Sequence, residues 1–423
     1  YFFEITISYL INKLVSPEAF GDIIITLDST AFLAQWALFG RQWVTLAYLP
    51  IYKVRNQLGK IVGFIKLNLG AVTFSSLIIS VMFFVCYYLS NAQTIGYFLY
   101  FLWKDPSNIN LPTYHFVVFV AMMIPISSIS TLLATVLVGM GFPILSNALE
   151  RVVRPTVSLL IYVYFVYVSN KAFYPVYTFV VWSGTHIGLI CCVAFCIWIK
   201  VYRHIQHATA EYELSLWLKK GIAPTIYELC RRGVVVGSLV LEEILHHDEV
   251  LVAVYAVSLG LAEIIFVVFR GVVINLALPN ISAVFPEYHS TQKRLSRLFV
   301  FLFLQAFVAF VVFSVFGATI LSWFNTKYVA GYNALMILVI GYISHLLLGV
   351  SAHVLKLGKK LKIVNIAHVF MLFLSLILGL ILIPVYGIEG AAFSVTFPLI
   401  ATYLFLTFYT KKVLGFSCYA IFV

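Results

Sequence analysis

The sequence predicts an all-α polytopic membrane protein of about twelve transmembrane helices in two six-helix lobes. Hydrophobic residues make up 62% of the chain, charged residues only 10%, and the mean hydropathy is +1.02. A soluble protein of this length does not need so much apolar surface. The apolar segments are long, unbroken and rich in Leu, Ile, Val and Phe. Such segments are typical of membrane-spanning helices and not of the short alternating strands of a barrel.

An internal repeat predicts the two lobes. Phe39–Pro50 (FGRQWVTLAYLP) resembles Phe269–Pro279 (FRGVVINLALP). Each copy closes an apolar segment with Phe, Gly and Arg, reaches a Leu-Pro, and precedes a basic connector and a further apolar segment. One copy lies early in each half of the chain. A membrane-type sequence that repeats its plan once indicates two similar lobes.

The apolar segments divide the chain into predicted spans, of which the first is cut short. The chain begins at Tyr1 without Met, and we interpret its first apolar segment as a helix whose start is missing. We expect an N-terminal lobe over 1–200, a cytoplasmic linker over 201–222 and a C-terminal lobe over 223–423. The predicted spans are 1–14, 22–40, 63–89, 113–139, 154–168, 173–199, 223–245, 249–277, 298–323, 332–355, 363–384 and 388–410.

Basic residues predict the orientation. The connectors that follow the even-numbered spans are rich in Lys and Arg, so we expect them, and both termini, on the cytoplasmic side. The net charge of +11 is explained by short basic loops beside anionic lipid headgroups, which excludes nucleic acid as the partner. The alternate connectors hold only Lys13, Lys104, Lys171 and Lys327.

No pattern for catalysis, nucleotides or metals is found. The six cysteines and ten histidines are dispersed and complete no four-ligand set. Gly59-Lys60 and Gly358-Lys359 lack the other residues of a phosphate-binding loop, and no Ser/His/Asp pattern occurs. We therefore expect neither an enzyme nor an ATP-driven pump, and no cofactor or metal.

Charges inside the predicted spans are the candidate functional residues, because each is costly in the bilayer unless it faces protein or water. A mixture that includes several arginines suits an anionic headgroup, since Arg binds phosphate oxygens in a bidentate manner. The candidates are Asp28 and Arg41 near span 2, Arg231 and Arg232 in span 7, and Glu263 and Arg270 in span 8.

Each candidate also has a structural interpretation. Glu228 and Arg232 stand four residues apart and can neutralise each other, whereas Arg231 has no obvious local partner. Arg41 is equally explained as one more cytoplasmic anchor. The adjacent acids Glu242 and Glu243 are expected to be solvated at the outer boundary.

Several motifs together resemble the Wzx-type oligosaccharide flippases, which belong to the multidrug/oligosaccharidyl-lipid/polysaccharide exporter superfamily. Ser16–Gly21 (SPEAFG) resembles the family's signature after its first helix. Leu355–Lys360 (LKLGKK) and Ile381–Ala392 (ILIPVYGIEGAA) follow the family's pattern after span 10. Phe324–Leu335 and Pro224 also match, so the resemblance covers essentially the whole chain.

The resemblance implies two six-helix lobes in a V around a central cavity, alternating access, and transfer of undecaprenyl-diphosphate-linked oligosaccharides across the bacterial inner membrane during lipopolysaccharide (O-antigen) and polysaccharide biosynthesis. Lipid II flippases of the same superfamily carry charges at places that Asp28, Arg41 and Arg270 match. They have fourteen helices and an Arg-rich first helix, and this chain departs on both counts. A glycan repeat unit is therefore the favoured substrate.

Three functions are weighed. In the first, a flippase that works as a monomer, Arg41, Arg231, Arg232 and Arg270 contact the diphosphate. Asp28 and Glu263 then act as gating groups or couple transport to Na⁺ or H⁺. A polysaccharide polymerase is the expected protein partner. The alternative is a cation-coupled multidrug antiporter, which predicts a cavity dominated by carboxylates. A polysaccharide synthase or polymerase needs a large polar segment, which this chain lacks.

Overall fold

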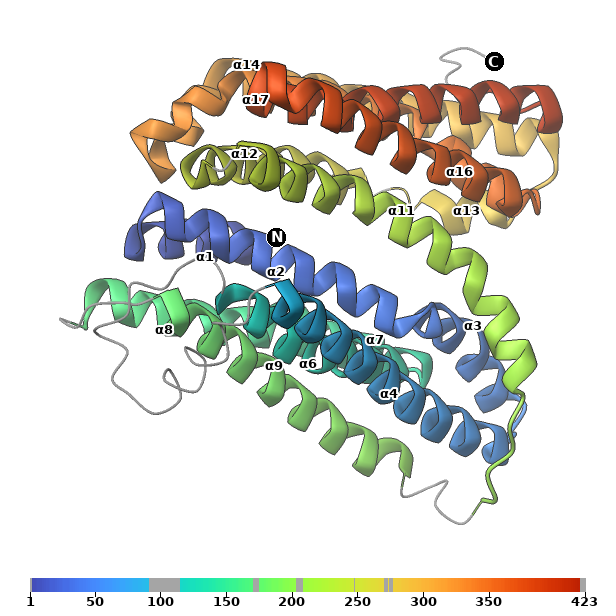
Figure 1. The fold of residues 1–423 in the computed structure, drawn as a ribbon. Coiled ribbons are helices and arrows are strands. Elements are labelled where there is room, and N and C mark those ends of the chain that lie inside the picture. Colours follow the sequence, from blue (N-terminus) through green and yellow to red (C-terminus); the bar gives the residue numbers. More distant parts are fainter. Residues whose placement is uncertain are drawn as a thin grey trace. The chain divides into compact units, whose positions relative to one another are not determined.

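A computed structural model describes residues 2–90, 115–169, 175–202, 208–246, 248–269, 273 and 277–418 of the chain. Within these residues every regular element is a helix (Figure 1). This confirms the all-α class that the long apolar segments predict.

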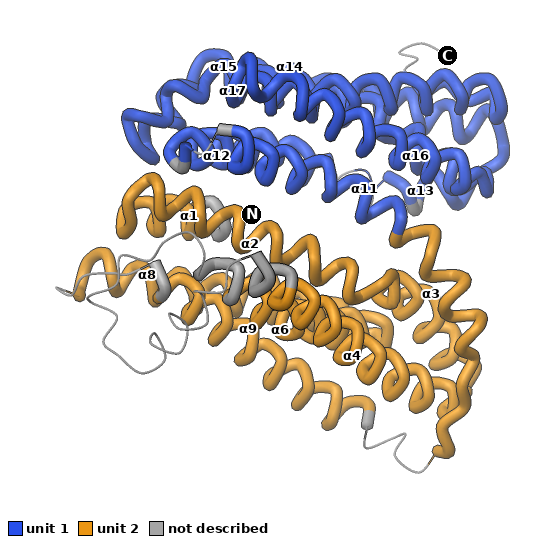
Figure 2. Tube along the Cα trace, in the orientation of Figure 1, with its two compact units in different colours: residues 1, 226–423 blue, residues 2–225 orange. Residues whose placement is uncertain are grey.

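The chain forms two compact units, and the division between them falls inside helix α11 (Figure 2). The N-terminal unit is Phe2–Thr225 and the C-terminal unit begins at Ile226. The N-terminal unit consists of α1 (Phe2–Leu14), α2 (Pro17–Leu38), α3 (Arg41–Val54), α4 (Leu58–Ser90), α6 (His115–Gly139), α7 (Pro143–Ala148), the π-helical turn η2 (Leu149–Val153), α8 (Arg154–Tyr167), α9 (Pro175–Ile197), the π-helical turn η3 (Trp198–Tyr202) and the start of α11 (Leu214–His246).

The C-terminal unit contains the rest of α11 and the helices that follow it. These are α12 (Glu249–Phe269), α13 (Leu278–Ser282), α14 (Tyr288–Phe324), the 3₁₀ turn η5 (Thr326–Gly331), α15 (Tyr332–Leu348), α16 (Val350–Leu357) and α17 (Leu361–Leu414). The last of these is two helices joined end to end, because Gly387 has φ 57° and ψ −135° in its middle. Only glycine enters that region without strain.

The described parts of the predicted spans fall on these helices, with the last two spans on the halves of α17. Among the described residues, seven helices are long and apolar enough to cross a membrane, or eight if the bent pair of α2 and α3 is counted as one span. Helix α14 has the surface expected of a membrane-spanning helix. Its Phe303, Leu304 and Phe307 side chains are all more than half exposed, which suits lipid and not water. The chain is therefore a multi-pass membrane protein.

The two motifs at the ends of α2 have clear local roles. The Ser16 side chain accepts a hydrogen bond from the Ala19 amide at 3.4 Å, and Pro17 occupies the first turn, so the SPEAFG motif starts a helix. At the other end Phe39 and Gly40 both adopt left-handed backbone, with φ 42° and 70°. These residues bend the chain by 51° between α2 and α3. In the second copy of the repeat, the equivalent Phe269 is the last described residue of α12.

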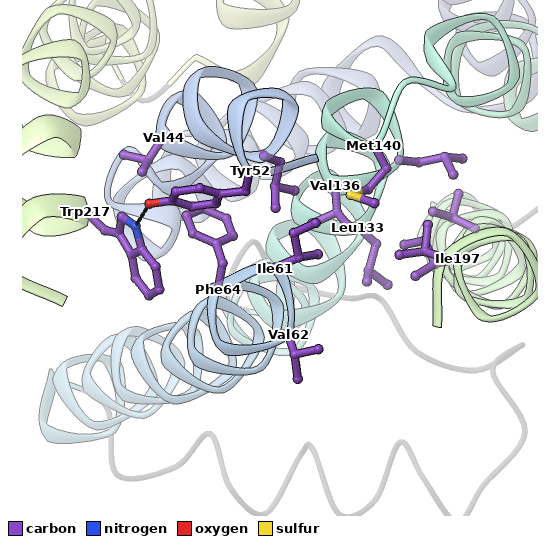
Figure 3. Packing of buried hydrophobic residues seen from close by; sticks show 14 of the residues in the cluster. Val44, Tyr52, Ile61, Val62, Phe64, Leu133, Val136, Met140, Ile197 and Trp217 are labelled. Carbon is purple, nitrogen blue, oxygen red and sulfur yellow. Dashed lines mark hydrogen bonds between the residues drawn. The ribbon is translucent and has the colours of Figure 1, made fainter. Parts of the chain in front are cut away.

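The core of the N-terminal unit gathers side chains from α3, α4, α6, α9 and the start of α11 (Figure 3). Trp217 of α11 is 3% exposed and packs edge-on against Phe64 with ring centroids 4.9 Å apart. Its indole N–H donates to the Tyr52 hydroxyl at 2.9 Å. A large aromatic residue with a satisfied polar atom is well suited to close such a core.

Candidate functional site

A cluster of buried polar groups lies in the C-terminal unit, around Arg231 of α11. The Arg231 guanidinium donates to Glu228 at 2.6 Å through Nη2 and at 3.5 Å through Nε. Its charged group also lies 4.6 Å from the ring centroid of Phe266 on α12. Both charged side chains are less than a fifth exposed. Arg231 is therefore held by a carboxylate and an aromatic face.

This geometry corrects one expectation from the sequence. Arg231 was expected to lack a local partner, and Glu228 to pair with Arg232 four residues on. The structure instead places Arg231 closest to Glu228, while Arg232 Nε is 3.6 Å from the same carboxylate. The Arg232 side chain is 37% exposed. Arg231 therefore makes two hydrogen bonds to Glu228, whereas Arg232 has only the longer ion pair with it.

Glu263 of α12 belongs to the same cluster. Its carboxylate accepts a hydrogen bond from the Tyr342 hydroxyl of α15 at 3.3 Å, and its charge interacts with that of Arg231. Glu228 and Glu263 together oppose Arg231 and Arg232, so these four charges balance. Lys356 of α16 adds one positive charge, 3.5 Å from the ring centroid of Tyr227.

Histidines on different helices also meet here, although they are dispersed in the sequence. The His345 ring packs against Phe269 and Tyr403, at centroid distances of 4.6 and 4.5 Å. His368 lies with Nδ1 2.8 Å from the Val364 carbonyl, so that nitrogen must carry the proton. Its Nε2 then accepts from the Tyr403 hydroxyl at 3.2 Å.

His345 itself is almost fully buried, and its Nδ1 has no hydrogen-bond partner among the residues that the structure describes. Sequence reasoning missed this group because no spacing along the chain joins α15 to α17. A buried His on each of two neighbouring spans was the available signal.

The remaining predicted residues are placed as follows. Arg41 begins α3, is partly buried, and donates to the Leu38 carbonyl at 3.3 Å. Asp28 lies in the middle of α2, partly buried and engaged in electrostatic or hydrogen-bond contact. Both belong to the N-terminal unit. Arg270 lies outside the described residues, so its predicted role stays a prediction.

The expectation for the acids at the end of span 7 is wrong in part. Glu242 is not solvated: it is fully buried and interacts electrostatically with Tyr255 of α12. Burial of a carboxylate requires compensating partners. Within the described parts of the chain, no three His, Cys, Asp or Glu side chains are grouped so that they could hold a metal ion.

Comparison with known proteins identifies the fold. No protein-family model and no curated protein matches the sequence. Among solved structures, an inward-facing multidrug resistance MATE family transporter of the MOP superfamily matches 98% of this chain and 94% of its own, with TM-score 0.74 at 10% identity.

Two further solved structures are similar. A MOP superfamily transporter from Pyrococcus furiosus has TM-score 0.55 at 10% identity, over 98% of this chain and 92% of its own. A mutant of a Vibrio cholerae MATE transporter has TM-score 0.52 at 15% identity, over 99% and 93%. The chain thus has the two-lobed helical fold of the MATE transporters of the MOP superfamily.

Proposed function

We propose that this chain is a membrane transporter that works by alternating access. The observation that carries the proposal is the fold match over nearly the whole length of both chains, to proteins named as transporters. An enzymatic function finds no support in that comparison.

A cation-coupled multidrug antiporter is the substrate class that the structural neighbours favour. Several of them are named as multidrug resistance or MATE transporters. The balanced charges around Arg231 agree with this class better than a purely cationic site would, since Glu228 and Glu263 are both present. In this version Asp28 and Glu263 are the groups that bind the coupling cation.

A flippase for lipid-linked oligosaccharides is the second candidate, and its specific support is the sequence resemblance together with Arg232. That arginine stands beside Glu228, which already pairs with Arg231, and its side chain is 37% exposed, which suits a phosphate ligand. Another protein of this fold is described by the reverse polarity of its binding pocket, which suggests a different function. If the chain is a flippase, Arg41, Arg232 and Arg270 contact the diphosphate, whereas Arg231 stays paired with Glu228.

One experiment decides between the two substrate classes. The purified chain is reconstituted in liposomes and tested in parallel for transfer of a fluorescent undecaprenyl-diphosphate oligosaccharide between leaflets and for extrusion of a cationic dye. Each assay is run with an imposed sodium or proton gradient and without one. Arg232→Gln is compared with Arg151→Gln, a matched change of an exposed arginine in η2.

Lipid-linked transfer that falls at least tenfold in Arg232→Gln and not in the matched variant supports the flippase. Gradient-dependent dye extrusion without lipid transfer supports the antiporter. If the reconstituted protein moves neither substrate under any gradient, the proposed function is rejected for both classes.

A further inference from the structure

The segment that precedes α11 is fastened to α3 and α4 of the N-terminal unit, to which it belongs. The Glu211 amide donates to the Gly59 carbonyl at 2.9 Å. The Glu213 carboxylate accepts from Lys60 Nζ and from the Tyr52 hydroxyl, each at 2.6 Å. A Cβ on Gly63 would collide with the Glu211 carbonyl, so this segment lies directly on the start of α4. We name residues 208–213 the strap.

The first part of α11 continues this attachment. Trp217 is buried in the core of the N-terminal unit. One turn later Gly221 passes the bend between α2 and α3, where a Cβ on Gly40 would collide with the Gly221 carbonyl and with Thr225 Oγ1. With its φ of 70°, Gly40 is required both by its backbone conformation and by this close approach.

Between Thr225 and Tyr227, the contacts of α11 pass from the N-terminal unit to the C-terminal unit. Thr225 lies against Gly40 of the N-terminal unit. Tyr227 packs against His368 of the C-terminal unit with ring centroids 4.5 Å apart, and its ring also faces Lys356. No loop separates the units at this place, because α11 runs without interruption from Leu214 to His246.

Helix α11 lacks a backbone hydrogen bond at this boundary between the two units. Pro224 has no N–H, so the Lys220 carbonyl loses its helical partner. The Thr225 hydroxyl donates to the Gly221 carbonyl at 2.6 Å, a side-chain bond that competes with the helical pattern and often bends helices. Kinks in helices occur at such positions.

We propose that the two units move relative to one another by bending α11 at Pro224–Thr225, with the strap and the first three turns of α11 moving as part of the N-terminal unit. The inference deepens the proposed transport by naming its hinge, and it can be tested without any substrate.

The test is a reversible metal clip across the hinge. In a cysteine-free background, Ile222→His with Ile226→His places two imidazoles one turn apart, a spacing that binds Zn²⁺ on a helix. Ile222 is 43% exposed. The matched control, Leu214→His with Leu218→His, puts the same clip on the exposed face of the first turns, where the side chains are 50% and 39% exposed. Spin labels at exposed Val153 and Val413 report the distance between the units.

We expect Zn²⁺ to narrow the inter-unit distance distribution at least twofold in the hinge clip, to leave the control clip and the unclipped protein unchanged, and to be reversed by chelation. Pro224→Ala, which restores the helical donor, should narrow the distribution without metal. The hinge is rejected if the metal-bound hinge clip keeps the full distribution, or if the control clip narrows it equally. Failure of transport with a narrowed distribution rejects the proposed function and leaves the hinge standing.

Discussion

Replacement of Glu228 by Gln should destabilise the C-terminal unit strongly, because it leaves Arg231 buried without its carboxylate. The two groups are 2.6 Å apart, with side chains 13% and 16% exposed. At that separation, and with an effective dielectric constant of about 20, their attraction is about 6 kcal/mol. Desolvation offsets part of this, and loss of one partner of a buried pair typically costs about 3–5 kcal/mol.

The assay is thermal and denaturant unfolding of the purified protein in detergent, followed by tryptophan fluorescence. We expect Glu228→Gln to lower the free energy of unfolding by about 3–5 kcal/mol, and to lower Tm by about 10 °C. Glu228→Gln with Arg231→Gln removes both charges, so it should recover about 2 kcal/mol of that loss. Arg232→Gln alone should cost less than about 1 kcal/mol, since its pair is longer and more exposed.

Two results would refute this reasoning. Glu228→Gln could leave stability within about 1 kcal/mol of the unmodified chain, the range of an exposed pair. Alternatively, the double variant could be destabilised by the sum of its single changes, which would mean that the two groups do not interact. In either case Arg231 would be free to act as a direct substrate contact.

Three further outcomes are expected. Trp217→Ala should destabilise the N-terminal unit by about 3–5 kcal/mol in the same unfolding assay, because it empties a closed core; a loss below about 1 kcal/mol would contradict the packing. Hydrogen bonds from Lys60 and then Tyr52 lower the pKa of Glu213, so the stability it contributes is present above its unfolded pKa and is lost as the pH falls through its folded pKa. Unfolding curves of Glu213→Gln and the unmodified chain should therefore differ at neutral pH and converge in acid, and a constant difference would oppose the linkage. Gln292→Ala should speed maleimide labelling of buried Cys418 at least tenfold, because the Gln292 side chain holds the neighbouring Ser417 backbone by two hydrogen bonds of 2.8 and 2.9 Å; unchanged labelling would show that the tail is held elsewhere.

Long apolar segments made the helices predictable, since a run of about twenty apolar residues is typical of a membrane-spanning helix and of few other structures. The sequence could not show how the last two predicted spans are joined. The junction depends on Gly387, whose non-helical backbone no hydropathy pattern records. The repeat marked the end of an apolar segment at Phe39–Gly40, but neither the left-handed backbone there nor the close approach of α11 was predictable.

Charges within spans identified Arg231, Arg232 and Glu263 as separate candidates, and the structure brings them together around Glu228. The choice of partner was not predictable, because positions three and four residues away share one helix face. Phe266 on the next helix settles it by stacking under Arg231. The meeting of His345, His368 and Tyr403 depends wholly on how α15 and α17 pack.

The buried position of Trp217 has a consequence for synthesis of the chain. Because Trp217 completes the core formed by α3, α4, α6 and α9, we expect that core to stay open until the beginning of α11 has been synthesised. Domains generally fold as units, and during translation the N-terminal domain folds first. Nascent chains ending near residue 200 should therefore keep Phe64 and Val44 accessible to proteases and chaperones, whereas chains extended through Thr225 should be protected. If the chain is split into two fragments for coexpression, the N-terminal fragment should therefore end after Thr225.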